Sequence, residues 1–129
     1  ETRRLMRQCD LLVLPSLFDG WGAVVNEALQ SGMRVLCSTA CGAASLLDGR
    51  QRGGSFDPDR PESLRRALRE WLDKGRLSPA ERKAIAAWAE QTISGAAAAR
   101  YLVHIVHYTE GREENRPAAP WAPLKETAS

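Results

Sequence analysis

Two acidic residues flank a glycine-rich turn near the start of the chain. Asp19 directly precedes Gly20, Trp21 and Gly22, and Glu27 follows within an otherwise apolar stretch. Carboxylates accept hydrogen bonds from sugar hydroxyls, while the unpaired backbone amides of a glycine-rich turn bind phosphate oxygens. A carboxylate among apolar residues is costly unless it meets a partner, so Glu27 is expected to have one. These residue types at this spacing favour a site for a ligand that carries both hydroxyl and phosphate groups.

A strand and a helix are expected to position these groups. Residues 11–14 are an uninterrupted apolar run, which is typical of a strand buried on both faces of a parallel sheet. After the turn, one side of a helical pattern is apolar, at Val24, Val25, Ala28 and Leu29. Asp19 then lies at the carboxyl end of the strand and Glu27 points back toward the helix start, so both overlook one crevice. With the helix dipole and the amides of residues 20–23, a nucleotide-diphosphate sugar would satisfy all of these groups at once.

The same two acids also have a plainer interpretation. Glu27 would merely pair with a buried base such as Arg34, and Asp19 would only shape a turn. The spacing of the residues does not choose between this internal pairing and a ligand site.

The order of the following elements predicts an α/β fold. Further strands are expected at residues 34–38 and around residues 54–56, with a short helix at residues 42–47 between them. Alternating strands and helices produce parallel pairing with right-handed crossovers. The apolar strand at residues 11–14 requires a neighbour on each side, and the chain supplies only one. We therefore expect a partial, Rossmann-like parallel sheet followed by C-terminal helices.

The second half of the chain is expected to be helical. One helical segment lies within residues 61–75, where apolar residues recur on a single face. Ser78 and Glu81 have the spacing of a capping box, which predicts the start of a second helix. Residues 94–95, Ser-Gly, are expected to separate it from a third. Proline-rich residues 111–129 predict an extended tail.

The turn and its surroundings resemble a known family of enzymes. The run LVLPSLFDGWG at residues 12–22, with VNEA at residues 25–28 and SGMRV at residues 31–35, resembles the retaining GT-B glycosyltransferases of the glycogen synthase/mannosyltransferase type. The resemblance covers roughly residues 9–73. It implies that the partial sheet is the second half of a GT-B C-terminal domain.

The resemblance also implies a role for each residue of the turn. The donor sugar would be bound by Asp19, Gly20, Trp21 and Gly22. The amides of Ala23 and Val24 would hold the diphosphate, and Glu27 would bind the ribose. Asp19 is one methylene shorter than the glutamate usual in the family, and residues 40–42 read Ala-Cys-Gly where paired glycines are common. The shorter Asp19 implies a longer or water-mediated contact to the sugar, and the change at residues 40–42 implies a donor preference that differs from that of relatives.

An activity and a missing part are implied as well. Residues 1–110 would belong to the nucleotide-sugar-binding domain of an enzyme that moves a sugar from a nucleotide-diphosphate sugar to a saccharide or lipid acceptor. Bacterial surface polysaccharide or lipopolysaccharide synthesis is the expected setting, with no cofactor. Catalytic groups are expected in an absent N-terminal domain, so this chain alone should be inactive. The alternative is a non-catalytic α/β module that binds a nucleotide or a partner.

Composition narrows the other function classes. The chain has 18 basic and 16 acidic residues, and this net charge of +2 excludes a simple polybasic nucleic-acid binder. Three cysteines are too few for a disulfide scaffold and favour a reducing cytoplasm. No apolar run is long enough to span a membrane. The chain begins at Glu1 without a secretory leader, and we expect it to be part of a longer protein.

For two groups of residues, a metal site is one of two interpretations. Cys37 and Cys41 are favoured as small buried thiols, with a metal site as the alternative. His104, His107 and Glu110 follow helical spacing and are favoured as surface or interface residues, with zinc ligation as the alternative.

Two groups of arginines could together form a basic face. The first group is Arg3, Arg4 and Arg7, and the second is Arg65, Arg66 and Arg69. A solvated helix surface is the favoured interpretation. The sharper alternative is attraction to anionic lipid headgroups, which would place a cytoplasmic protein peripherally at the inner membrane face.

Overall fold

The computed structural model describes residues 1–47 and 49–122. In chain order its elements are α1 (Thr2–Gln8), β1 (Leu11–Leu14), α2 (Ala23–Gln30), β2 (Arg34–Ser38), the 3-10 helix η1 (Gly42–Leu46), β3 (Gly53–Phe56), α3 (Pro61–Asp73), α4 (Pro79–Ile93) and α5 (Gly95–Thr109). They form two compact units, Glu1–Ala89 and a second that starts at Glu90, and each unit is described by itself. The predicted order of strands and helices is confirmed.

The first unit is built on one parallel sheet with the strand order β1-β2-β3. The register places Leu11 beside Arg34 and Val35 beside Gly53. Every residue of the central strand β2 is buried, whereas β1 pairs with β2 alone and leaves Val13 36% exposed. The apolar run of β1 therefore lies at an open edge among the described residues, as the missing neighbour predicted. The expected partial parallel sheet is confirmed.

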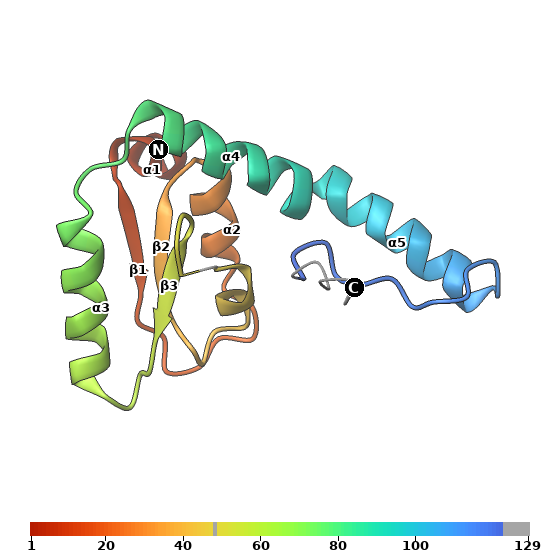
Figure 1. Cartoon of the computed structure of the whole chain (residues 1–129), viewed down its shortest axis with the longest axis horizontal. Coiled ribbons are helices and arrows are strands. Elements are labelled where there is room, and N and C mark those ends of the chain that lie inside the picture. The colour runs from red at the N-terminus through yellow and green to blue at the C-terminus, as the bar shows by residue number, and fades with distance from the viewer. Residues whose placement is uncertain (48, 123–129) are drawn as a thin grey trace, which may run out of the picture. The chain divides into compact units, whose positions relative to one another are not determined.

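Helices cover both faces of this sheet (Figure 1). On one face α3 packs against the strands, where Leu36, Phe56 and Trp71 form a buried cluster. The partly buried residues around that cluster are Leu11, Leu64, Ala67 and Leu68. On the opposite face α2 lies beside β1 and β2 and buries Val25, Ala28 and Leu29. The apolar stripes predicted for α2 and α3 are thus the faces that contact the sheet.

Side-chain caps begin two helices as predicted. The Ser78 amide and hydroxyl donate to Glu81 Oε2 at 2.8 and 2.7 Å, and the Glu81 amide donates to Ser78 Oγ at 3.2 Å. These reciprocal bonds are the capping box at the start of α4. In the second unit, Ser94 Oγ accepts a hydrogen bond from the Ala97 amide at 3.1 Å and caps α5. The predicted break at residues 94–95 is confirmed.

The second unit contains α5 and the first part of the tail. The exposed large apolar residues of α5 are Leu102, Val103, Val106 and Tyr108. The Tyr101 hydroxyl donates to the Pro117 carbonyl at 3.4 Å, so the described part of the tail folds back beside α5. Residues 123–129 of the expected tail lie outside the described residues, and the boundary after residue 110 stays a prediction. Among the helices described, none combines the length and apolarity that crossing a membrane requires.

Candidate functional site

The acidic turn, residues 19–22, lies beyond the carboxyl end of β1. Asp19 Oδ1 accepts a hydrogen bond from the Trp21 amide at 3.1 Å, so this carboxylate does shape the turn. Its Oδ2 has no hydrogen-bond partner among the described residues. Gly22, with φ +85°, is the N-cap of α2, and this left-handed conformation favours glycine. Asp19 therefore combines a structural role with a carboxylate oxygen that remains available to a ligand.

A second loop, residues 40–43 after β2, holds the acidic turn in place. The Asp19 amide donates to the Ala40 carbonyl and the Gly42 amide donates to the Asp19 carbonyl, both at 3.2 Å. The Ala43 amide donates to the Trp21 carbonyl at 2.7 Å. These bonds form a short parallel bridge that extends the β1–β2 pairing beyond the strands. Backbone bonds between the two loops thus fix the conformation of the turn.

The close approach of the two loops explains which small residues they need. A Cβ at Gly42 would meet the Gly20 carbonyl oxygen, and a Cβ at Gly22 would meet Cys41 Sγ. The Cys41 thiol also donates to the Trp21 carbonyl at 3.0 Å. Sequence reasoning noted residues 40–42 only as a departure from paired glycines and did not find this supporting role. The signal was weak, because the contact joins segments far apart in the chain.

Trp21 is also held through its side chain. Its indole Nε1 donates to Asn26 Oδ1 at 2.9 Å, and the side chain remains partly exposed beside the start of α2. Asn26 was not predicted as a site residue. The bond fixes the direction of an aromatic ring next to the turn.

The start of α2 presents unpaired donors. The amides of Gly20, Gly22, Ala23 and Val24 have no acceptor among the described residues. Amides at a helix N-terminus carry partial positive charge and bind anions. The predicted phosphate-binding segment is therefore built as a donor-rich surface.

Glu27 lies exposed on α2, and its carboxylate makes no hydrogen bond or ion pair with any described residue. The suggested internal partner, Arg34, instead pairs with Glu81 at 2.7 Å. The interpretation of Glu27 as the partner of Arg34 is therefore wrong. The partner that the sequence led us to expect for Glu27 is not needed, because its carboxylate is exposed to solvent and carries no cost of burial.

The two thiols behind the turn are buried, as favoured by the sequence. Burial raises the pKa of the Cys37 thiol to about 12, and the neighbouring Cys41 adds to the rise. Cys37 therefore stays protonated in neutral solution, whereas a metal ligand must be a thiolate. Within the part of the chain that the structure describes, no three His, Cys, Asp or Glu side chains gather as metal ligands.

His104 and His107 lie at the surface of α5, as the sequence favoured, beside an acid outside their helical series. His104 Nδ1 lies 2.8 Å from Glu113 Oε1, and His107 Nδ1 lies 3.8 Å from the same oxygen. Glu110 pairs with Arg112 at 3.1 Å. The two histidines and Glu110 therefore do not meet at one point. The carboxylate beside the histidines is that of Glu113, which follows α5 in the chain.

Comparisons with known proteins cover most of the chain. The profile of the family described as "Glycosyl transferases group 1" matches residues 1–91. A sucrose synthase from Denitrovibrio acetiphilus is 26% identical over 69 residues, which make up 54% of this chain and 9% of that protein. The structure of a sucrose-phosphate synthase from Thermosynechococcus elongatus matches with a TM-score of 0.58 at 18% identity, covering 84% of this chain and 27% of that one. The structural likeness confirms the predicted fold class, and the chain spans only a small part of either protein.

Proposed function

Since the chain belongs to the group 1 glycosyltransferase family, we propose that it is the donor-binding part of an enzyme that transfers a sugar from a nucleotide-diphosphate sugar. The acceptor is a saccharide or a lipid, and the anomeric configuration of the sugar is retained. The observation that carries this proposal is the acidic turn, where unpaired amides, an available Asp19 oxygen and the unpartnered Glu27 lie at the carboxyl edge of a parallel sheet. Open α/β sheets bind their ligands at this edge.

Each group has a specific role in the proposal. Asp19 accepts hydrogen bonds from the donor sugar, which also contacts Gly20, Trp21 and Gly22. The amides of Ala23 and Val24 bind the diphosphate, because their charge complements its negative oxygens. Glu27 accepts hydrogen bonds from the ribose hydroxyls. The bridge between the acidic turn and residues 40–43 supports these roles, because it keeps the donors in place before a ligand arrives.

The proposal includes a part of the protein outside this chain. The open edge of β1, with Val13 36% exposed, supports further strands beside it. An N-terminal domain would supply the catalytic groups and the acceptor site, so this chain alone is inactive. Its coverage of 9% and 27% of the two relatives is in keeping with this arrangement.

The acceptor is proposed only as a class. The two relatives are named for the synthesis of sucrose and sucrose phosphate, so these names give no support to a surface polysaccharide or lipopolysaccharide role. Contact with anionic lipids at the inner membrane face remains part of the proposal for a cytoplasmic protein. Its support is limited, because Arg65 pairs with Glu62 at 2.9 Å and acidic residues lie on the same helix.

Donor binding tests the proposal directly. The full-length protein is titrated calorimetrically with a panel of UDP-, GDP-, ADP- and TDP-sugars, and one nucleotide class is expected to bind. Glu27→Ala should weaken that binding by about 1–3 kcal/mol, as for a lost hydrogen bond to a charged group. The matched control is Glu90→Ala, which removes an exposed acid of α4 and should leave the affinity unchanged.

Two results would count against the proposal. Equal affinity of the Glu27→Ala variant and the unaltered chain, with both folded, would remove Glu27 from the site. Nucleotide binding without sugar transfer by the protein joined to its N-terminal part would favour the non-catalytic module instead.

A further inference from the structure

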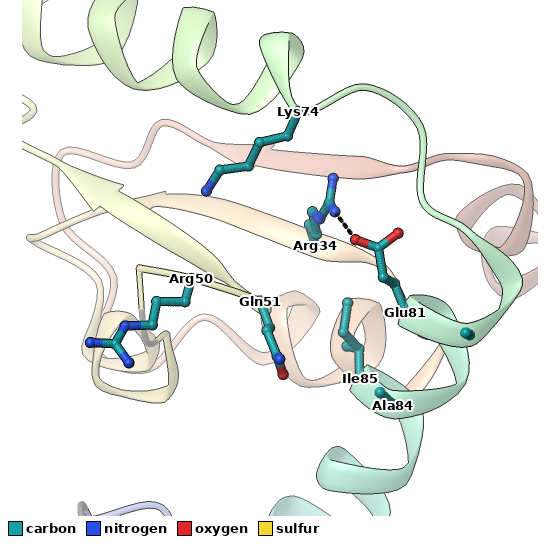
Figure 2. A pocket seen from close by; sticks show the side chains of 8 residues that line it. Arg34, Arg50, Gln51, Lys74, Glu81, Ala84 and Ile85 are labelled. Atoms are coloured by element: carbon teal, nitrogen blue, oxygen red, sulfur yellow. Dashed lines mark hydrogen bonds and ion pairs between the residues drawn. The ribbon is translucent and has the colours of Figure 1, made fainter.

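A cavity of about 440 Å³ lies at the amino edge of the sheet, where β2 begins, whereas the acidic turn lies at the carboxyl edge. Figure 2 shows the side chains that line the cavity. Arg34 reaches it from the first residue of β2, Lys74 from the end of α3, and Glu81 from the first turn of α4. Its remaining lining residues are Arg50, Gln51, Ala80, Ala84 and Ile85. Three of the eight lining residues are cationic (Arg34, Arg50 and Lys74) and one is anionic (Glu81).

Arg34 is the buried cation of this cavity. Its side chain is 7% exposed, Nη2 donates to Glu81 Oε1 at 2.7 Å, and Nη1 donates to the Gly75 carbonyl at 3.2 Å. Its buried Nε has no hydrogen-bond partner among the described residues. A buried donor without an acceptor is destabilising, because it has lost its water and gained nothing in return. This unused donor leaves Arg34, a lining residue of the cavity, with an unmet hydrogen-bonding demand.

Lys74 brings a second cation close to the first. Its ammonium lies 3.5 Å from the centroid of the Trp71 ring, and the Arg34 guanidinium carbon lies 5.6 Å from the same centroid. The ion pair of Lys74 with Glu70 is long, at 3.5 Å, and leaves other ammonium protons unused. Two like charges that share one aromatic ring repel each other, and an anion beside them relieves that repulsion.

The acid of the cavity is held by partners of its own. Glu81 accepts bonds from the Ser78 amide, the Ser78 hydroxyl and Arg34, so its oxygens are already engaged. The Ala80 amide, in the first turn of α4, has no acceptor among the described residues. The N-terminal end of this helix adds a further partial positive charge to the cavity wall.

We propose that this cavity binds a phosphate group, either free phosphate or a phosphate monoester of a small metabolite. The anion would lie between Lys74 and the first turn of α4, with Arg34 behind it. Ala84 and Ile85 form an apolar wall that leaves room for the body of a monoester. The site is separate from the acidic turn, and it stands whether or not the turn binds a nucleotide sugar.

The test is a titration of the chain with inorganic phosphate, followed by two-dimensional ¹H–¹⁵N NMR at constant ionic strength. The Ala80 amide and the Arg34 Nε resonances should shift and saturate. Lys74→Ala should weaken the binding about tenfold, as for the loss of one charged hydrogen bond. The matched control is Lys83→Ala, which removes an exposed lysine of α4 that does not line the cavity.

A second arm uses glycerol 3-phosphate. Tighter binding than inorganic phosphate would identify a monoester site, and equal or weaker binding would identify a site for free phosphate. The proposal is overturned if the shifts fail to saturate and spread over exposed basic residues, or if the two lysine variants weaken binding equally. Arg34 is left intact in every variant, because its removal would also unpair Glu81.

Discussion

The two edges of the sheet hold their polar groups in different ways. At the carboxyl edge, the acidic turn is fixed by backbone hydrogen bonds to residues 40–43 and by close contacts at glycines. At the amino edge, side-chain charges hold one another, as in the pairs of Arg34 with Glu81 and of Arg82 with Asp10. Substitutions that add volume should therefore destabilise the carboxyl edge, whose stability should hardly depend on salt or pH. The stability of the amino edge should depend on both salt and pH.

The largest expected effect concerns the thiol behind the carboxyl edge. The pKa of Cys37, raised to about 12 by burial, keeps it protonated near neutral pH. Iodoacetamide should therefore label Cys37 in the native chain about a thousandfold more slowly than the exposed Cys9. Mass spectrometry of the labelled peptides measures both rates, and unfolding in urea should make the two equal. Labelling of native Cys37 at the rate of Cys9 would show that this edge opens easily.

The next effect tests the close approach of the two loops. Gly42→Ala places a methyl group against the Gly20 carbonyl and should lower the free energy of unfolding by about 3 kcal/mol, because backbone must shift. Gly20→Ala is the matched control, since nothing lies within 4 Å of its added Cβ, and its effect should stay within about 0.5 kcal/mol. Urea denaturation measures both. Equal losses of unfolding free energy in the two variants would mean that the close approach of the two loops does not make the carboxyl edge sensitive to added volume.

A smaller loss is expected at the amino edge. Asp10 accepts bonds from the Leu77 amide and Arg82 Nη2, both at 3.1 Å, and pairs with Arg76 at 3.3 Å. Asp10→Ala should lower the free energy of unfolding by about 1–2 kcal/mol, and less in about 1 M salt, because the lost contacts are partly ionic. Asp59→Ala, at an exposed turn position, is the control for the change of charge. A loss that does not depend on salt would contradict the role of charge at this edge.

The smallest effect is a dependence on pH. The Ser78 amide and hydroxyl, with a contribution from Arg34, hold the pKa of Glu81 below its ordinary value of 4.5. The stability that ionised Glu81 contributes is therefore present above that ordinary value and is lost as the pH falls through the lowered pKa. Glu81→Gln keeps a capping side chain but removes the charge. Its urea midpoint should lie below that of the unaltered chain at neutral pH, and the two should converge in acid.

The control for this measurement is Glu90→Gln, which changes an exposed acid without a described partner. It should show no difference from the unaltered chain that depends on pH. A difference between Glu81→Gln and the unaltered chain that persists in acid would show that Glu81 acts through its shape and not through its charge.

Much of the fold could be predicted because its signals are local. The bounds of β2, the break at residues 94–95 and the capping box of Ser78 and Glu81 each depend on residues a few positions apart. Hydrophobic runs and caps act over one or two turns of chain, so they are visible in the sequence. The residues of the acidic turn were recognisable for the same reason.

The rest of the candidate site depends on contacts between distant segments. Cys41 supports Trp21 across 20 positions, and Arg34 meets Glu81 across 47. Neither separation along the sequence corresponds to a helical or strand period, so no local sequence pattern predicts these partners. The cavity at the amino edge was missed for this reason, because β2, α3 and α4 each contribute to it.

The sequence by itself determined which segments are strands and helices and which residues form the acidic turn, because apolar periodicity and caps act on near neighbours. Only the tertiary structure decided that Glu27 remains without a partner while Arg34 pairs with Glu81. The physical reason is the path of the chain: parallel crossovers bring strand starts to one edge and strand ends to the other. Which charges then meet is a property of the packed sheet and its helices.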